Sequence, residues 1–251
     1  MNDSSDEKRL SVWDHLDDLR RVLFRCVVAL GVTSTLTFVF SDWLLRWLMR
    51  PYERGLADAL LKGGAPVLQT LYPSETFMLS FKIALVAGIV LALPVLLHQL
   101  WSFVAPGLKN QEKKALLPAL FAGTGLFVVG ALFAFYLVVP MALHFFWEYG
   151  TRMGVQTSWT VSHYIGFVLM FLLAFGAAFE LPLVVVLLTV FGILEPATIA
   201  ARRPYVIVGI FVVAAILTPP DVVSQISLAL PMWVLFEGSL AVSQFLVRKK
   251  T

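Results

Sequence analysis

The sequence predicts an all-α polytopic membrane protein, a bundle of six transmembrane helices forming one membrane domain over residues 1–251. Hydrophobic residues make up 59% of the chain and charged residues only 14%, whereas a soluble domain is about 45–50% apolar and about 25% charged. The mean hydropathy is +0.84. The apolar residues also gather into separate long segments. These observations exclude an ordinary soluble enzyme, an intrinsically disordered chain and a nucleic-acid-binding protein.

Six apolar segments mark the expected membrane spans. They cover residues 22–40, 76–97, 115–139, 164–191, 205–217 and 226–242. At about 1.5 Å per helical residue, the first four are long enough to cross a hydrocarbon core of about 30 Å. The last two are short, and we expect two short crossings, with a shallow re-entrant hairpin as the alternative.

Residues 1–21 are expected to form a cytoplasmic amphipathic segment, in which the stretch from Ser11 is a helix that enters the first span. Leucines recur there at helical spacing, and they are Leu16, Leu19 and Leu23. Asp14, Asp17 and Asp18 share one face of that helix. The acidic start and the absence of a small-residue cleavage site after the first apolar run argue against a cleavable signal peptide.

The cations divide unevenly between the connections, which predicts the orientation. The richer set is Lys8, Arg9, Arg20, Arg21, Lys109, Lys113, Lys114, Arg202, Arg203, Arg248, Lys249 and Lys250. The poorer set is Arg46, Arg50, Arg54, Lys62 and Arg152. Because cytoplasmic loops carry the excess of Lys and Arg, both termini are expected in the cytoplasm.

The longest connection, residues 41–75, is expected to be an ordered cap rather than a loose linker. It is rich in prolines and interfacial aromatic residues, namely Trp43, Trp47, Pro51, Tyr52, Pro66, Tyr72 and Pro73.

The connection after the second span carries a single acid, Glu112, the only one between Glu75 and Glu148. Pro106 and Gly107 end the second helix, and Trp101 and Phe103 suit an interfacial position. Glu112 is either a ligand-binding group or a structural residue that pairs with a neighbouring lysine or begins the third helix.

Two acids near the last three spans are further candidates. Glu180 lies within the fourth span, and a carboxyl group inside a membrane is a functional-site hypothesis by default. The alternative is a neutral carboxyl group bonded to a neighbouring helix, where Pro182 frees a backbone carbonyl. Asp221 ends the sequence Thr218-Pro-Pro-Asp, which a turn and a helix cap explain well.

Other function classes find less support in the residues. A proton-coupled small-molecule transporter that uses Glu180 remains the alternative. A membrane-embedded hydrolase lacks a recognisable catalytic pair. No metal or cofactor is expected, because the four histidines have no ligand-like spacing and Cys26 is the only cysteine.

In order along the chain, the motifs resemble the TatC family, the signal-peptide receptor subunits of the twin-arginine protein translocase. The matching residues are His15, Leu16, Leu19, Arg20, Pro94, Gln99, Trp101, Phe103, Pro106, Glu112, Phe175, Gly176, Phe179, Glu180, Pro182, Arg203, Pro204, Tyr205, Leu217 to Asp221, Ser224 and Gln225. No single motif is specific for this family, but the whole set in this order is.

The resemblance implies a cup-shaped bundle in the bacterial cytoplasmic (inner) membrane, with the last two spans short and both termini cytoplasmic. It implies a receptor, not an enzyme, that binds twin-arginine signal peptides of folded proteins for export driven by the proton-motive force. The implied partners are the single-span TatA and TatB subunits in an oligomeric complex.

The resemblance also assigns roles to particular residues. Glu112, with Phe103 and Pro106 near it, matches the signal-peptide site, and Asp18 aligns with the glutamate of the family's N-terminal motif. Glu180 matches an intramembrane glutamate associated with partner contacts and the inserted peptide. Further contact positions are Pro51 and Asp221. A carboxylate accepts an arginine guanidinium through two parallel hydrogen bonds, so two carboxylates suit a pair of arginines.

Overall fold

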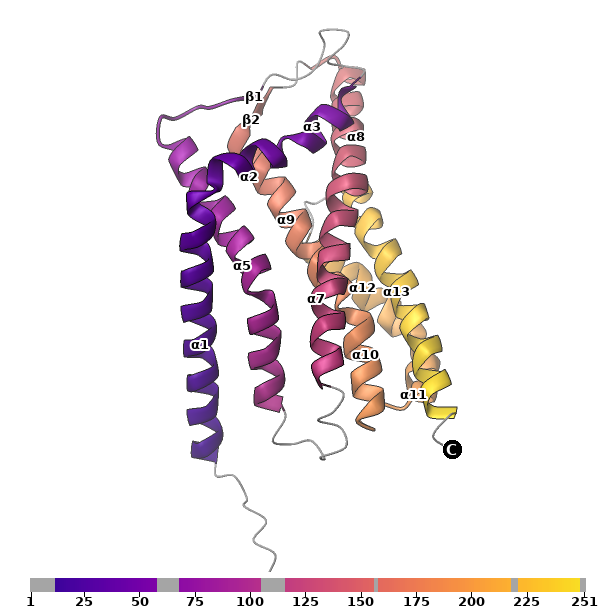
Figure 1. The fold of residues 1–251 in the computed structure, drawn as a ribbon. Helices are drawn as coiled ribbons and strands as arrows, with labels where there is room; N and C mark the ends of the chain where they lie inside the picture. Colours follow the sequence, from indigo (N-terminus) through magenta and orange to yellow (C-terminus); the bar gives the residue numbers. More distant parts are fainter. Residues whose placement is uncertain (1–11, 58–67, 105–115, 156–157, 218–220, 249–251) are drawn as a thin grey trace, which may run out of the picture.

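The protein is a bundle of long helices lying side by side, seen as a ribbon in Figure 1. The computed structural model describes residues 12–57, 68–104, 116–155, 158–217 and 221–248. Helix α1 begins and helix α13 ends at one end of the bundle, which we call the basal end (Figure 1). The short helices α2 and α3 and two short strands lie at the other end, the cap end.

The elements follow in this order along the described chain. They are α1 (Val12–Val39), α2 (Ser41–Leu48), α3 (Arg50–Gly55), β1 (Leu68–Gln69), α5 (Glu75–Val104), α7 (Leu116–Phe133), the π-helical turn η2 (Ala134–Val138), α8 (Val139–Arg152), β2 (Trp159–Thr160), α9 (Val161–Phe179), α10 (Leu181–Val190), α11 (Pro196–Ala201), α12 (Arg203–Leu217) and α13 (Val222–Arg248).

The expected apolar segments are helical over nearly all of their described residues, with Phe40, Glu180 and Phe191 in turns. By length and composition, five helical stretches of the described chain are suited to cross a membrane, and α12 is a shorter apolar helix of 15 residues. The short fifth segment is therefore confirmed. The last helix is longer than predicted, with 27 residues, because polar residues such as Gln225 and Gln244 continue it beyond residues 226–242. That length, about 40 Å, favours a full crossing over a shallow hairpin.

The third segment continues further than the sequence predicts. Helix α7 passes through the π-helical turn η2 into α8, which ends at Arg152. Pro140 lies in the first turn of α8. A proline ring clashes with the carbonyl four residues before it, and the wider π-helical turn accommodates Pro140 without ending the helix.

The fourth segment is divided at Glu180, which lies between α9 and α10. Pro182 occupies the first turn of α10, where a helix tolerates proline because the amide hydrogens there have no intrahelical partner. The chain therefore ends one helix and begins another at the acidic residue.

Helices α7 and α9 pack closely because glycines face large neighbours. A Cβ atom placed on Gly130 would lie 2.5 Å from the carbonyl oxygen of Phe175, and one on Gly176 would lie 2.6 Å from the ring of Phe127. Around this contact lies the aromatic core, in which Phe135 and Phe171 are fully buried.

Helix α1 packs along α5, and hydroxyl groups tie the two helices together. Thr37 donates to the carbonyl of Ala84 over 2.7 Å, and Thr33 donates to the carbonyl of Gly88 over 2.9 Å. Many apolar side chains of α1 are exposed, among them Phe24 and Val32. Such a surface suits contact with lipid.

The cap is ordered, as the sequence predicts for the part of residues 41–75 that the structure describes; Pro66 lies outside it. The hydroxyl of Tyr164 in α9 donates to the carbonyl of Leu48 over 2.7 Å and accepts from the amide of Tyr52 over 3.2 Å. Strands β1 and β2 pair in parallel, with Leu68 opposite Trp159. The two cap-end connections are thus tied to each other and to α9.

Candidate functional site

At the basal end, α1 and α5 bring two of the expected site residues to the same level. The bonds from Thr33 and Thr37 to α5 set an antiparallel register between the two helices. Thr33 lies beside Gly88 in this register. Counting fifteen residues from each of them toward the basal end leads to Asp18 on α1 and Phe103 on α5, which are therefore at the same level.

Asp18 lies on the side of α1 that faces α5. The half-buried residues of α1 form one stripe, which includes Asp18, Val22, Cys26, Thr33 and Thr37. The two threonines on this stripe contact α5 directly, so Asp18 shares the face that packs on α5. Its neighbour Asp17 is exposed and lines a separate, shallow basal pocket of about 550 Å³ with Arg20, Arg21 and Phe24.

Two expected site residues, Glu112 and Pro106, lie outside the described residues. Helix α5 ends and α7 begins at the basal end (Figure 1). The connection that carries both residues therefore joins helix ends on the same side of the bundle as Asp18 and Phe103.

Glu180 lies at the junction of α9 and α10, against α7. Its side chain is half-buried, and its Oε1 atom is buried without a hydrogen-bond partner among the described residues. A Cβ atom placed on Gly123 would lie 2.9 Å from Glu180 Oε2 and 3.2 Å from Leu97 of α5. Nineteen residues of α9 precede Glu180 and ten of α10 follow it. The carboxyl group is therefore nearer to the middle of this 30-residue segment than to its basal end.

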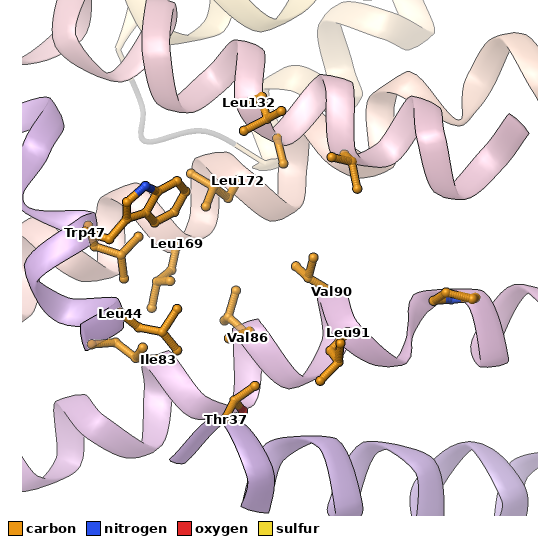
Figure 2. Close-up of a pocket in the computed structure, with 15 residues that line it drawn as sticks. Thr37, Leu44, Trp47, Ile83, Val86, Val90, Leu91, Leu132, Leu169 and Leu172 are labelled. Atoms are coloured by element: carbon orange, nitrogen blue, oxygen red, sulfur yellow. The ribbon is translucent and has the colours of Figure 1, made fainter. Parts of the chain in front are cut away.

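An apolar pocket of about 460 Å³ lies beneath the cap, between α5 on one side and α7 and α9 on the other. Figure 2 shows Trp47 of α2, Val90 of α5, Leu132 of α7 and Leu172 of α9 converging on it. Thr37 is its one hydroxyl-bearing residue, and that hydroxyl already bonds to Ala84. The pocket therefore suits an apolar segment.

Asp221 caps the last helix. Its Oδ1 atom accepts the amide of Ser224 over 2.7 Å, the bond expected of an N-cap residue. Its Oδ2 atom is buried without a partner in the described part of the chain. Next to it, Gln225 donates to the carbonyl of Phe211 over 3.2 Å, which ties α13 to α12. The interpretation as a helix cap is confirmed.

Pro51, expected as a contact position, is buried in the first turn of α3. Helix α3 packs against α8, and a Cβ atom on Gly55 would lie 2.7 Å from the carbonyl oxygen of Pro140. In the described structure, Pro51 therefore has the role of a buried proline that begins a helix of the cap.

An ion pair between α12 and α13 is a feature that sequence reasoning did not identify. Arg203 Nη2 lies 3.0 Å from Glu237 Oε2. The two residues are far apart in sequence, and only an antiparallel arrangement of the last two helices predicts that they meet. Across the described residues, no three His, Cys, Asp or Glu side chains are grouped so that they could hold a metal ion.

These elements define a multi-pass helical membrane protein with polar groups at its basal end and an apolar pocket beneath its cap. Comparison with known proteins narrows that class. A family model described as "Sec-independent protein translocase protein (TatC)" matches residues 14–231. The chain belongs to the TatC family and is a component of the twin-arginine protein translocase.

Individual relatives are similar over most of the chain. The TatC protein of Azotobacter chroococcum is 41% identical over 223 residues, which cover 89% of this chain and 85% of the relative. That of Carboxydothermus hydrogenoformans is 36% identical over 246 residues, covering 98% of this chain and 97% of the relative.

The fold also matches a solved structure. A crystal structure described as "Twin Arginine Translocase Receptor- TatC" aligns with a TM-score of 0.79 at 36% identity and covers 92% of this chain and 98% of that chain. The predicted family and fold class are thereby confirmed.

Proposed function

We propose that this chain is the receptor that binds twin-arginine signal peptides of folded proteins and begins their proton-motive-force-driven export. One observation carries the proposal. Asp18 lies on the α5-facing stripe of α1, level with Phe103 at the end of α5. The connection with Glu112 and Pro106 leaves from that same end. The name of the similar crystal structure, a translocase receptor, supports the same role.

The chemistry of the two carboxylates fits the proposed ligand. A guanidinium group presents a planar fork of N–H donors, which a carboxylate accepts in two parallel hydrogen bonds. A lysine ammonium group lacks that fork. In this proposal Asp18 and Glu112 each bind one arginine of the pair, and Phe103 and Pro106 flank them.

The apolar pocket beneath the cap is the proposed place for the hydrophobic stretch of the bound peptide. Along α5, the distance from Phe103 to Ile83, which lines the pocket, is about 30 Å at 1.5 Å per residue. A helical peptide segment of about 20 residues has that length. The signal peptide would therefore lie from the basal carboxylates to the pocket.

The distribution of charge supports an orientation with the basal end in the cytoplasm. Arg20 and Arg21 lie at the start of α1, Arg202 and Arg203 at the start of α12, and Arg248 ends α13. Because cytoplasmic loops carry an excess of Lys and Arg, this orientation puts both termini in the cytoplasm. The proposed location is the bacterial inner membrane, in which residues 1–251 form one domain.

TatA- and TatB-type single-span subunits are the proposed partners in an oligomeric complex. A single-span partner needs an apolar face, and exposed apolar side chains such as Ile216 and Val234 of the last two helices provide one. Glu180, Pro51 and Asp221 are the proposed contact positions. The role is that of a receptor, not an enzyme, and it uses no cofactor. Family membership favours it over the proton-coupled transporter.

The proposal is tested by binding a labelled twin-arginine signal peptide to the purified chain in nanodiscs. Asp18→Asn and Glu112→Gln remove the charge that strengthens the bonds to arginine, so each should weaken binding by about tenfold. A double-lysine peptide should bind more weakly than the arginine peptide. Fluorescence anisotropy measures both affinities.

Asp17→Asn is the matched control, because Asp17 is adjacent in sequence but exposed and off the α5-facing stripe. It should leave the affinity unchanged. If Asp17→Asn and Asp18→Asn weaken binding equally, peptide affinity depends only on the overall negative charge of this helix, and the assignment of Asp18 as an arginine-binding residue is wrong. If the wild-type chain does not prefer arginine over lysine even with TatB added, the receptor proposal is wrong.

A further inference from the structure

Helix α5 carries a lysine inside a predicted span, and this lysine has no counter-charge among the described residues. Lys82 is seven residues after Glu75, the first residue of α5, and so about 10 Å along the helix from the cap end. Its side chain is exposed, and it forms no ion pair with any carboxylate of the described residues. A charged group at this depth is costly unless it finds a partner.

Lys82 lines an interfacial pocket of about 800 Å³ between α5, α8 and α9, below strand β2. Around the start of α9 the lining carries Ser158, Thr160, Ser162 and His163, beside the aromatic rings of Trp159 and Tyr164. Further along α9 and on α8 the lining is apolar, with Gly166, Phe167, Met170, Leu143 and Phe146, and Lys82 reaches the pocket from α5. This division matches a ligand with a polar head and a hydrocarbon tail.

The polar part is held in a fixed arrangement. Pairing of β1 with β2 fixes Trp159 and Thr160, and Thr160 is the N-cap residue of α9, accepting the amide of His163 over 3.2 Å. The His163 Nδ1 atom also bonds to the Thr160 hydroxyl. The start of α9 adds the partial positive charge of a helix N-terminus to the lysine charge.

Glu75, seven residues before Lys82 on α5, is already engaged. Its Oε2 atom accepts the amide of Leu71 over 2.7 Å, and its Oε1 atom accepts the amide of Ser162 over 3.3 Å. These bonds hold the Glu75 carboxylate against the backbone, so the Lys82 ammonium group is left for another anion.

We infer that the interfacial pocket binds the phosphate headgroup of an anionic phospholipid from the leaflet at the cap end. Lys82 contacts the phosphate, the hydroxyl groups of Ser162 and Ser158 donate to its oxygens, and an acyl chain lies along Phe167 and Met170. A phosphate at the level of the membrane surface attracts a lysine whose stem extends toward it. The inference does not depend on the proposed receptor role.

The test is native mass spectrometry of the full chain in detergent, titrated with dioleoyl phosphatidylglycerol or with dioleoyl phosphatidylcholine. We expect one tightly bound phosphatidylglycerol and weaker binding of phosphatidylcholine. Lys82→Gln should weaken the phosphatidylglycerol affinity about five- to tenfold. Lys82→Arg, which retains the charge, should preserve it.

Arg46→Gln is the matched control, because Arg46 is an exposed cation at the cap end that does not line the pocket. It should leave the affinity unchanged. A second variant, Gly166→Leu, probes the apolar part, where a Cβ atom on Gly166 has no other atom within 4 Å. The leucine should fill the pocket and weaken binding of both lipids.

Three results would overturn the inference. One is equal loss of affinity in Lys82→Gln and Arg46→Gln, and another is no loss in either Lys82→Gln or Gly166→Leu. The third is displacement of the lipid by free glycerol 3-phosphate at similar concentrations, which would identify a site for soluble phosphate and not for lipid.

Discussion

Gly123 sets the space available to the Glu180 carboxyl group. A methyl group on Gly123 would lie 2.9 Å from Glu180 Oε2 and 3.0 Å from Leu183. Gly123→Ala should therefore displace the ends of these flexible side chains and destabilise the protein by no more than about 1 kcal/mol. Thermal unfolding in detergent measures the change.

Gly125 supplies the control on the same helix, because a Cβ atom placed there has no atom within 4 Å. Gly125→Ala should be neutral or should stabilise by up to about 1 kcal/mol, since alanine favours a helix more than glycine does. Equal melting temperatures for the two variants would show that Glu180 is not confined by α7.

Single residues were predictable from the sequence where their role is local. The cap formed by Asp221 follows from its position before a helix. The partners of Tyr164 do not, because Leu48 and Tyr52 are more than a hundred residues away in the chain. The surroundings of Glu180 depend on Gly123 in the same way, and no local pattern indicates that neighbour.

Between elements, the Arg203–Glu237 ion pair should fasten α12 to α13 near the basal end. Both side chains are more than one-third exposed, so the coupling should be small, about 0.3–1 kcal/mol. A double-mutant cycle of Arg203→Gln and Glu237→Gln, followed by thermal unfolding, measures it.

The charge-reversed double variant, Arg203→Glu with Glu237→Arg, should recover part of the stability that either reversal loses alone. If the two neutral substitutions prove additive, the pair makes no net contribution, and the contacts of Gln225 and the apolar side chains alone hold these helices together.

Helices were predictable from apolar segments, but their ends and interruptions were not. The spacing of apolar residues predicts a helix over residues 164–191. It does not predict the break at Glu180, because that break depends on how Pro182 is accommodated. In the third segment the opposite occurs, because a π-helical turn lets the helix continue past Pro140. Both sites contain a proline, and sequence alone does not distinguish a break from a wider turn.

For the whole molecule, the unequal lengths of the helices imply a preferred bilayer thickness. Helix α12 has 15 residues, or about 22 Å, whereas a typical hydrocarbon core is about 30 Å thick. The protein should therefore unfold at a higher temperature in nanodiscs of lipids with 14-carbon acyl chains than in those with 22-carbon chains. The thinner bilayer reduces the difference between the length of α12 and the thickness of the hydrocarbon core.

Lengthening α12 by three leucines after Val213 should shift that preference toward thicker bilayers. If melting temperatures do not depend on lipid length in either variant, α12 does not contact the full thickness of the bilayer.

The number of spans and the family were predictable at the level of the whole molecule, because hydropathy and ordered motifs extend over the chain. The pockets were not. The apolar pocket beneath the cap is formed by α1, α2, α5, α7 and α9 together, and the interfacial pocket needs the pairing of β1 with β2. Such cavities depend on contacts between distant segments, which a single sequence does not specify.

The pairing of β1 with β2 also has a consequence for biosynthesis. Its two halves, Leu68–Gln69 and Trp159–Thr160, are separated by about ninety residues that include α5, α7 and α8. During translation the first helical hairpin is therefore inserted while β1 has no partner strand, and the bonds from Tyr164 to the cap form only after the ribosome has delivered α9. A chain truncated before residue 158 should expose α2 and α3 to membrane proteases, and this interval of synthesis is where a membrane chaperone would act.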